Sequence, residues 1–572
     1  MNNHQVAEIF SAMADILDIM DANYHRVMAY RRAAETVDTL GRPVEEVWRQ
    51  GELMSIPGIG DTLASKIDEL MRTGELEAYQ ELTSQVPEGV VAMLDVPGIG
   101  PKSAARFWKE LGLTTVEALE QAALAGRLRE LHGFGAKSEQ NVLDGIAFLK
   151  RRTGRSRLGD AWSLAQSILS QLRDVPGVLQ AAPAGSLRRM RETVGDLDIL
   201  VASPDAQPVT ERFTHLADVD EVMLSGATKT SVRTRSGLQV DLRVLEPERW
   251  GTALQYFTGS QAHNIHLRGL ALDRGLSLSE YALKSADESE ILCASEADVY
   301  ATLGLPPIPP ELREDRGEIE AALEGRLPDL VALDDLKGDF QFHTTGSDGR
   351  HSLLEMARAA RARGLAYALV TDHSHGLGVT GGLTAEGLRQ QRAAVDAVNE
   401  RLDGTFQLLA GIEVEVRSDG SLDLPADALA ELDLVVASLH TGLRQPQEQF
   451  TERMVSAIRN PHVDIIAHPT GRLIGEREGA NLDMEAVFRA AAETGTALEI
   501  NAHPSRLDLR DVHVRRAVEL GVKLVISSDA HSVEGFDVLR FGVGTARRGW
   551  ATAADVLNTL SVHELLTWAS RT

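Results

Sequence analysis

The sequence contains a single cysteine, Cys293, among its 572 residues. One thiol excludes an internal disulfide framework and favours a reduced, cytoplasmic setting. No apolar run approaches the roughly 18 residues that a membrane-spanning helix needs. The N-terminal stretch MNNHQVAEIFSAMADILDIM carries acids within its apolar pattern, unlike a secretory signal peptide. These absences leave a cytoplasmic enzyme as the expected class.

The chain also lacks an excess of positive charge, since its formal net charge is −26. The charge is unevenly distributed: residues 101–200 hold 15 Lys+Arg against 11 Asp+Glu, whereas residues 301–500 hold 18 against 33. A basic run, KRRTGRSR, lies at 150–157, where a solvated linker is the alternative. A local basic region still permits DNA binding by an acidic chain. The length predicts about three to five domains.

Three stretches in the N-terminal third share one pattern: an apolar residue, a turn with G-x-G spacing, and then a helix. They are IPGIGDTLASKI at 56–67, VPGIGPKSAARF at 96–107 and LHGFGAKSEQNV at 131–142. Glycine permits close approach of another backbone, and a helix N-terminus offers unpaired N–H groups that suit a phosphate oxygen. A turn between packed helices explains one such stretch, but three favour contact with a nucleic-acid backbone. The expected contacts are Gly58, Gly60, Gly98, Gly100, Gly133 and Gly135.

Three aspartates in the middle of the chain are expected to converge. Asp196 and Asp198 are two residues apart at the start of a predicted strand, so both side chains project to the same face. Asp241 lies in a second predicted strand, LQVDLRVLE at 238–246. Converging carboxylates repel one another unless divalent cations hold them, and oxygen ligands suit Mg²⁺. Two such ions can activate an attacking hydroxyl and stabilise a leaving pyrophosphate.

Two longer motifs surround these aspartates. GSLRRMRETVGDLDILV at 185–201 supplies a tight turn, a hydroxyl and guanidinium groups for a triphosphate, and YFTGSQAHNIHLR follows at 256–268. The alternative, a polar strand end with surface arginines, accounts for Asp-x-Asp alone but not for the combination. Together the motifs resemble the nucleotidyltransferase signature and nucleotide-binding segment of bacterial family X DNA polymerases, the group related to DNA polymerase beta. The match runs in the expected order to about residue 310, and the three N-terminal stretches resemble helix-hairpin-helix motifs.

This resemblance implies a template-directed DNA polymerase that fills short gaps during repair. By position, Asp196, Asp198 and Asp241 would be the catalytic carboxylates that hold two Mg²⁺ or Mn²⁺ ions, with Asp241 or water accepting the primer hydroxyl proton. Ser186 and Arg189 would contact the triphosphate of the incoming dNTP, and Arg268 would touch the template side. The remaining residues expected to bind the dNTP, at the triphosphate turn, the sugar pocket and the base edge, are Gly185, Gly195, Tyr256, Phe257, Gly259 and Asn264.

Lys66 follows the first hairpin and aligns with the lysine that in DNA polymerase beta forms a Schiff base with an abasic sugar. A nucleophilic lysine needs a lowered pKa, for which Arg26 and Arg31 are candidate neighbours. Thr62 stands where that relative carries a further phosphate-binding lysine. Contact with DNA, rather than lyase chemistry, is therefore the role expected of Lys66.

The C-terminal part alternates strands and helices, which predicts an α/β barrel or a related parallel sheet. Seven strands are expected: DFQFH, YALVTDH, LLAGIEVEV, DLVVASLH, DIIAHP, ALEIN and KLVISSDAH. Candidate metal ligands lie at or just past the C-terminal ends of these strands, where a barrel assembles its chemistry. A lone histidine there is usually structural, but five histidines with acids favour a multinuclear Zn²⁺ or Mn²⁺ site. The candidates are His343, Asp348, His373, Glu413, His440, His468, Asp529 and His531.

This pattern resembles a PHP (polymerase and histidinol phosphatase) domain, in which nine ligands hold up to three ions. Eight positions match, whereas the opening His-x-His of the family reads Gln341-Phe342-His343. An amide oxygen is a poorer Zn²⁺ ligand than imidazole, so one ion is expected to bind weakly. The resemblance implies a Mn²⁺-dependent 3′–5′ exonuclease of reduced rate. His503, where the family usually has asparagine, is expected to support the ligands rather than bind metal. The resemblance groups the ligands as Gln341, His343, Glu413 and Asp529; then Glu413, His440 and His468; then Asp348, His373 and His531.

The expected fold is therefore multidomain, with a helical N-terminal region, an α+β nucleotidyltransferase palm and a C-terminal (βα)7-type PHP barrel. Gapped or primed double-stranded DNA and dNTPs are the expected partners of a monomer that makes no membrane contact. Two alternatives stay open: a barrel that hydrolyses small phosphate monoesters, and a catalytically weak DNA-repair scaffold. The expected bounds are 1–85 for a lyase-like helical domain, 86–157 for a fingers-type domain with two hairpins, 158–250 for the palm, 251–305 for a nucleotide-selecting thumb, 306–334 for a proline-rich and charged linker, and 335–572 for the PHP domain.

Overall fold

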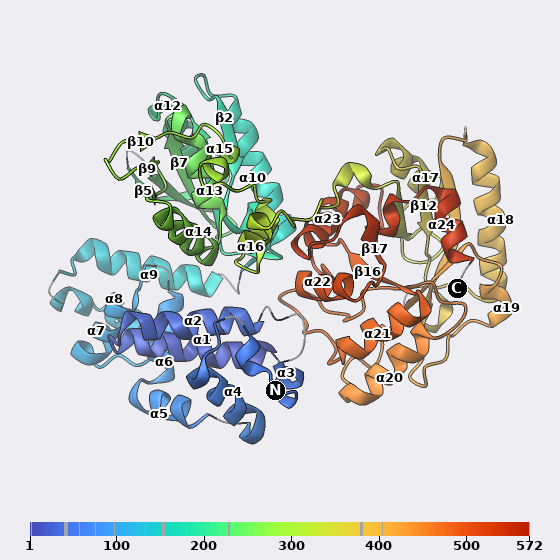
Figure 1. Ribbon diagram of the computed structural model, residues 1–572, viewed down its shortest axis with the longest axis horizontal. Coiled ribbons are helices and arrows are strands. Elements are labelled where there is room, and N and C mark those ends of the chain that lie inside the picture. Colours follow the sequence, from blue (N-terminus) through green and yellow to red (C-terminus); the bar gives the residue numbers. More distant parts are fainter. Residues whose placement is uncertain are drawn as a thin grey trace. The chain divides into compact units, whose positions relative to one another are not determined.

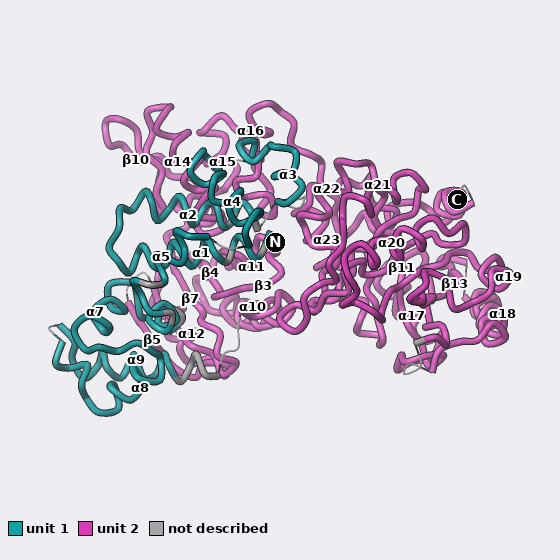
Figure 2. Tube along the Cα trace, turned by 90° about the horizontal axis from the view of Figure 1, so that it is seen from below, with its two compact units in different colours: residues 1–154 teal, residues 155–572 magenta. Residues whose placement is uncertain are grey.

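The computed structural model forms two compact units, residues 1–154 and residues 155–572 (Figures 1 and 2). Among the described residues, no helix is both long and apolar enough to cross a membrane. Residues 152–154 of the basic run lie outside the described residues. The structure describes residues 1, 3–38, 40, 44–56, 58–74, 76–96, 98–131, 133–151, 155–226, 229–377, 381–402 and 404–570.

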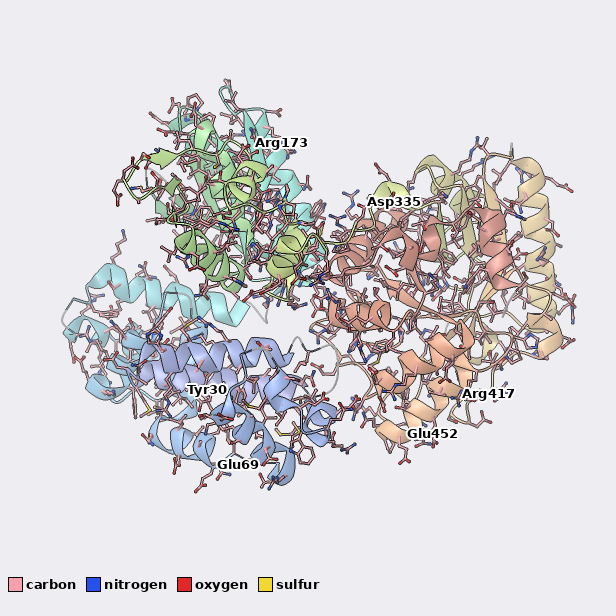
Figure 3. All side chains as sticks on the ribbon, in the orientation of Figure 1. Tyr30, Glu69, Arg173, Asp335, Arg417 and Glu452 are labelled. Atoms are coloured by element: carbon pink, nitrogen blue, oxygen red, sulfur yellow. The ribbon has the colours of Figure 1, made fainter. Side chains whose placement is uncertain are left out.

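The described part of the first unit is helical. Of the apolar positions that recur at three- and four-residue spacing in the first helix, Val6, Phe10, Met13 and Leu17 are buried and Ile9 is half-buried, whereas Met20, just past the helix, is exposed. Phe10 and Tyr30 pack edge-to-face across the first two helices with ring centroids 5.8 Å apart (Figure 3 labels Tyr30). The helices are α1 Asn3–Ile19, α2 Tyr24–Asp38, α3 Val44–Arg49, α4 Asp61–Thr73, α5 Glu77–Gln85, α6 Glu88–Val91, α7 Pro101–Leu111, α8 Val116–Leu124 and α9 Ala136–Arg151, with 3₁₀ turns η1 Leu53–Ser55, η2 Ala92–Asp95 and η3 Arg127–Glu130.

The second unit begins with a five-stranded sheet in the order β2-β4-β7-β6-β5, in which only β4 and β7 pair in parallel. Apolar side chains of two helices cover one face of this sheet. Arg173, labelled in Figure 3, donates to the Ala181 carbonyl at 3.0 Å and ties the first of these helices to the edge strand. The elements are α10 Leu158–Arg173, β2 Gln180–Pro183, α11 Gly185–Arg188, β4 Asp196–Ala202, α12 Gln207–Thr214, β5 Val219–Ser225, β6 Lys229–Thr234 and β7 Gln239–Leu245, with a small pair β1 Ser156–Arg157 and β3 Thr193–Val194.

A small α/β segment follows and packs around one buried histidine. His263 lies between the Glu318 carboxylate, 2.6 Å from its Nδ1, and the Tyr300 hydroxyl, 3.1 Å from its Nε2. Those contacts tie His263 to residues 37 and 55 positions later in the sequence, so they hold together distant parts of the segment. The elements are η4 Pro247–Arg249, α13 Trp250–Thr258, α14 Gln261–Asp273, β8 Ser277–Leu278, β9 Leu283–Lys284, β10 Glu290–Ile291, α15 Glu296–Thr302, η5 Pro310–Leu312 and α16 Glu318–Leu323.

The C-terminal part is a parallel seven-stranded barrel whose strands lie in chain order, which confirms the seven predicted strands. A parallel bridge between Phe342 and Ala530 joins the last strand to the first. The strands are β11 Gly338–Phe342, β12 Tyr367–Val370, β13 Gln407–Glu415, β14 Leu434–Ser438, β15 Ile465–Ile466, β16 Ala497–Asn501 and β17 Leu524–Ser527. The helices are α17 Leu353–Ala362, α18 Ala385–Arg401, α19 Ala426–Leu429, α20 Gln447–Ile458, α21 Met484–Thr494, α22 Asp511–Glu519, α23 Leu539–Arg548 and α24 Val562–Ala569, with 3₁₀ turns η6 Leu333–Asp335, η7 His375–Leu377, η8 Gly535–Val538, η9 Ala553–Asp555 and η10 Leu557–Thr559.

The barrel and the five-stranded sheet share an apolar contact. Trp162 of α10 packs edge-to-face on Phe541 of α23 with ring centroids 6.1 Å apart. Leu507 from the barrel is buried in the same apolar cluster as the sheet. A Cβ added to Gly159 would lie 2.6 Å from the Pro504 ring. The close approach at Gly159 thus depends on the absence of a side chain.

We expect Gly159→Ala to lower the thermal unfolding midpoint, because a rigid proline ring opposes the new methyl group and overpacking costs about 1–3 kcal/mol. Gly269→Ala is the matched control, since its added Cβ meets no atom within 4 Å in helix α14. Replacing an exposed helical glycine by alanine stabilises by about 1 kcal/mol, so the midpoint should not fall. Equal shifts for the two variants, measured by calorimetry on the full chain, would contradict a tight contact at Gly159.

Candidate active sites

The three predicted carboxylates converge on the five-stranded sheet. Asp198 of β4 lies directly opposite Asp241 of β7 in the parallel pair, and Asp196 lies opposite Gln239. Since side chains alternate along a strand, Asp196 and Asp198 share the face of Asp241. Burial, followed by the charges of Asp196 and Asp241, raises the pKa of Asp198 to about 7. The predicted convergence is therefore present in the structure.

Neighbouring cations offset this cluster of acids. Lys229 Nζ lies 2.5 Å from Asp241 Oδ2, and the Gln239 amide donates to the other oxygen at 3.0 Å. Arg243 lies two residues beyond Asp241 on β7, with its guanidinium carbon 4.4 Å from the Phe257 ring centroid. Mutually repelling carboxylates balanced by side chains that can move away fit a site for divalent cations. Sequence reasoning missed Lys229 and Arg243, although strand alternation from Asp241 would have placed Arg243 on this face.

The tight turn before β4 lies against Asp198. Gly185 has φ +58°, and a Cβ there would lie 2.3 Å from Asp198 Oδ2, so this position requires glycine. Ser186 is half-buried in the same turn. At the other end of the motif, a Cβ on Gly195 would lie 3.0 Å from Arg155 Nη1.

Both arginines of this turn contact the next segment. Arg188 donates to the Glu296 carboxylate at 2.6 Å and to the Thr258 hydroxyl at 2.6 Å. Arg189 donates to Glu314 at 3.0 Å and to the Thr258 carbonyl at 2.8 Å. The arginine predicted to contact a triphosphate is thus held by a carboxylate and a carbonyl.

The residues predicted to line a sugar pocket lie together at the α13–α14 turn. Tyr256 and Phe257 meet edge-to-face with ring centroids 5.2 Å apart. A Cβ on Gly259 would lie 2.5 Å from Asn264 Oδ1. The Asn264 amide, predicted at the base edge, donates to the Tyr256 carbonyl at 2.6 Å and accepts from Gln255 at 3.1 Å. Arg268 is exposed one turn further along α14.

The three hairpins repeat one geometry. In each, the residue between the two glycines donates its main-chain N–H to the carbonyl of the apolar residue three positions earlier. The distances are 3.1 Å for Ile59 to Ile56, 3.0 Å for Ile99 to Val96 and 2.9 Å for Phe134 to Leu131. Gly58, Gly98 and Gly133 have φ of +78°, +86° and +83°, which explains the first glycine of each pair. The intervening positions 57, 97 and 132 lie outside the described residues.

The second glycine of each pair has no such internal explanation. Gly60 and Gly100 have φ of −90° and −96°, which any residue adopts, and each caps a helix N-terminus. A Cβ on Gly60, Gly100 or Gly135 would meet no atom within 4 Å among the described residues. The fold itself therefore does not require glycine at these positions. An external backbone that approaches the helix N-terminus closely would require it.

Lys66 is half-buried on α4 after the first hairpin, and Thr62 is exposed. Arg31, one of its candidate cationic neighbours, forms ion pairs with Asp15 at 2.9 Å and Asp18 at 3.2 Å. Two acids therefore offset the charge of Arg31.

All eight predicted barrel ligands lie at one end of the barrel. Seven follow the end of a strand, whereas Glu413 lies inside β13, two residues before its last residue. Glu413 is central: its carboxylate oxygens lie 3.5 Å from His343, 3.2 Å from His373, 3.4 Å from His440 and 3.2 Å from His468.

The other two acids complete the cluster. Asp348 lies 3.5 Å from His373 and 3.5 Å from His531, and Asp529 lies 3.1 Å from His343. In the described part of the chain, two groups of residues could each hold a metal ion, because the ligand atoms within each group lie within 4.8 Å of one another. The groups are His343, Asp348, His373 and His531, and then His373, Glu413 and His440.

Electrostatics in this cluster favour ionised acids. Although burial opposes ionisation, the histidines hold the pKa of Asp348, Glu413 and Asp529 below its ordinary value. Burial likewise opposes protonation of His373, yet Glu413 and Asp348 raise its pKa to about 9. His343 Nδ1, His468 Nδ1 and Glu413 Oε1 are buried without a hydrogen-bond partner in the described structure. Imidazole and carboxylate donors with unsatisfied lone pairs fit divalent metal ions.

Further residues hold these ligands in place. Glu415 lies 2.9 Å from His440 Nδ1 and accepts from the Thr441 hydroxyl at 3.0 Å. Asn501 donates to Asp529 at 3.0 Å and accepts from the His503 N–H at 3.0 Å. Carboxylates and amides in this position orient metal ligands. Sequence reasoning missed Glu415, although its spacing of two residues from Glu413 puts both side chains on the same face of strand β13.

Gln341 is 1% exposed, and neither atom of its amide has a hydrogen-bond partner within the described residues. A buried, unsatisfied amide costs about 1–3 kcal/mol. A metal ion bound by the amide oxygen would relieve part of this cost, though a histidine would be the better donor.

Three family models match separate parts of the chain. A helix-hairpin-helix domain model matches residues 1–76, a SAM-like helix-hairpin-helix tandem matches 90–147, and a DNA polymerase beta thumb matches 253–314. The DNA polymerase/3′-5′ exonuclease PolX of Bacillus subtilis (strain 168) is 39% identical over 574 residues, covering 100% of both chains. DNA polymerase lambda of Rattus norvegicus is 26% identical over 54% of this chain and 56% of its own. A probable phosphatase of Thermoanaerobacter sp. (strain X514) is 34% identical over 39% of this chain and 89% of its own.

We expect Gln341→His to tighten Mn²⁺ binding by the barrel, because imidazole replaces a neutral amide at the position that the family resemblance groups with His343, Glu413 and Asp529. Calorimetric titration of the metal-free chain with Mn²⁺ measures this directly. Gln390→His, on the exposed face of α18, controls for an added histidine. Identical Mn²⁺ isotherms for both variants and the wild type would show that position 341 is not a ligand position.

Proposed function

The chain belongs to the PolX family of DNA polymerases with a 3′–5′ exonuclease, and we propose that it extends primer 3′ ends across short gaps in DNA and trims 3′ ends in its barrel. The full-length similarity to the Bacillus subtilis protein supports both activities on one chain. The substrates proposed are dNTPs and gapped or primed duplex DNA, bound by a monomer.

One observation carries the polymerase proposal: the parallel register that puts Asp198 opposite Asp241, beside the glycine turn at Gly185. Asp196, Asp198 and Asp241 would hold two Mg²⁺ or Mn²⁺ ions. Bound there, such ions supply activation of the primer hydroxyl and charge stabilisation on the leaving pyrophosphate.

The chain's own groups then position the nucleotide. Lys229 gives up Asp241 as the carboxylates take cations, and Ser186 and Arg189 bind the triphosphate. Tyr256 and Phe257 line the sugar pocket. Asn264, which holds the Tyr256 carbonyl at 2.6 Å, fixes that pocket and would reach the base edge only after leaving this contact.

The barrel would hydrolyse the terminal phosphodiester at a DNA 3′ end. Its eight ligands and Gln341 would hold up to three Mn²⁺ or Zn²⁺ ions, which would supply Lewis acidity and activation of water. Glu415 orients His440, and Asn501 orients Asp529.

A second candidate for the barrel is hydrolysis of small phosphate monoesters, which the 34% identity to a probable phosphatase favours. Turnover of nitrophenyl phosphate faster than that of a labelled DNA 3′ end, at equal enzyme concentration, would support this candidate over the exonuclease.

The two active sites should be separable by substitution. Asp196→Ala removes a carboxylate from the sheet and should reduce primer extension on a gapped duplex by at least about 10³-fold, since transition-state charge loses its stabilisation. Release of nucleotides from the 3′ end in Mn²⁺ should persist. His440→Ala should have the opposite pattern. Loss of both activities in either variant, with gap binding retained, would contradict two independent sites.

The hairpins and Lys66 would bind the DNA backbone, the hairpins through amide groups at helix N-termini. Gly60→Ala and Gly100→Ala test this, because the added methyl group meets no atom within 4 Å among the described residues but would obstruct a phosphate. We expect the Kd for gapped DNA to rise several-fold while the thermal midpoint is maintained. Gln121→Ala, exposed on α8, is the control. Unchanged DNA affinity in both glycine variants would exclude these turns as contacts.

A further inference from the structure

Glu314 is a buried carboxylate surrounded by three arginines. Its side chain is 3% exposed, and it lies 3.0 Å from Arg189 Nε, 3.5 Å from Arg191 Nη1 and 2.8 Å from Arg548 Nη1. Arg189 and Arg191 follow the turn that lies against the catalytic carboxylates. Arg548 is the last residue of α23 in the barrel.

Arg548 joins the two parts of the second unit by more than one bond. Its Nη1 also donates to the main-chain carbonyl of Arg189 at 2.7 Å, while its Nε and Nη2 donate to Asp511 at 3.0 and 2.8 Å. Asp511 in turn accepts from Arg316 at 3.1 Å. Arg548 thus fixes both the partner of the Arg189 side chain and the backbone that carries it.

The proposed role of Arg189 requires it to leave Glu314. A buried carboxylate that loses its only cation is strongly destabilised, so such an exchange is costly unless another cation stays in contact. Arg548 meets that requirement at 2.8 Å, closer than Arg191 at 3.5 Å. Burial, together with the charges of Arg548 and Arg191, also lowers the pKa of Arg189, although its ion pair with Glu314 acts in the opposite sense.

We propose that Arg548 of the barrel is a positioning residue for the triphosphate subsite of the polymerase. It retains Glu314 and the Arg189 backbone, so that the Arg189 guanidinium can exchange Glu314 for the triphosphate of a dNTP. The inference rests on the proposed polymerase function and extends it: the barrel contributes to nucleotide binding independently of its own metal chemistry.

The test is single-nucleotide extension on a gapped duplex by the full-length Arg548→Gln variant. Without Arg548, Glu314 keeps Arg189 as its main partner, so the KM for dNTP should rise roughly tenfold while kcat changes less than about twofold. Arg547→Gln is the matched control, because this neighbour on α23 pairs with Glu311 at 2.8 Å and, within the described residues, forms no ion pair or hydrogen bond with Glu314 or Arg189. Its KM should remain at the wild-type value.

A second-site change separates positioning from folding. Adding Glu314→Gln to Arg548→Gln removes the carboxylate that retains Arg189, so the dNTP KM should return toward the wild-type value. Arg548→Lys should show an intermediate KM, because one ammonium group can hold Glu314 but not all three partners. The thermal midpoint and the Mn²⁺-dependent release of 3′ nucleotides confirm that each variant is folded.

Two results would overturn the proposal: a KM for Arg548→Gln equal to that of Arg547→Gln, or a raised KM that Glu314→Gln does not lower. A wild-type chain that extends no primer would contradict the proposed polymerase function instead. In that case, dNTP affinity measured on a gapped duplex with a blocked 3′ end still compares Arg548→Gln with Arg547→Gln, so the two failures are distinguishable.

Discussion

Repulsion between converging carboxylates is the constraint on which both candidate active sites depend. On the sheet, Asp196, Asp198 and Asp241 are balanced by the cations Lys229 and Arg243, which would have to move for metal ions to bind. In the barrel, the acids are balanced by histidines, which can lose a proton and become ligands without moving. The sheet thus offsets its acids with side chains that metal ions would have to displace, whereas the barrel offsets them with side chains that can themselves be metal donors.

Sequence predicted the parts of these sites that follow from strand periodicity and chain order. The seven barrel strands, the ligands beyond their ends and the convergence of Asp196, Asp198 and Asp241 follow from strand patterns and two-residue alternation, whereas the residue-by-residue pairing of Asp198 with Asp241 was not predicted. Contacts between distant segments were not predictable in this way. Arg189 and Arg548 are 359 residues apart, and nothing local to either residue indicates that they share Glu314. The hydrogen bond from the Asn264 amide to the Tyr256 carbonyl was likewise not predictable, because it depends on how the chain folds back at the α13–α14 turn.

The hairpins show how an acidic chain can offer a surface to DNA. Positive φ explains Gly58, Gly98 and Gly133, but Gly60 and Gly100 have ordinary backbone angles and open space where a side chain would lie. Main-chain amides at a helix N-terminus attract a phosphate without any net positive charge. The net charge of −26 therefore weakens long-range attraction more than it weakens contact at these turns.

The joint between the sheet and the barrel combines apolar packing with a buried ionic network, and the two serve different purposes. Trp162, Phe541 and Leu507 bury apolar area, which stabilises the joint directly. Buried ion pairs add little net stability, because desolvation cancels most of the attraction between their charges. The cluster of Arg189, Arg548 and Glu314 is therefore better explained by the geometry that it imposes than by the strength of the joint. Three arginines surround the single carboxylate of Glu314. One guanidinium could therefore bind an incoming polyanion while the others keep Glu314 paired.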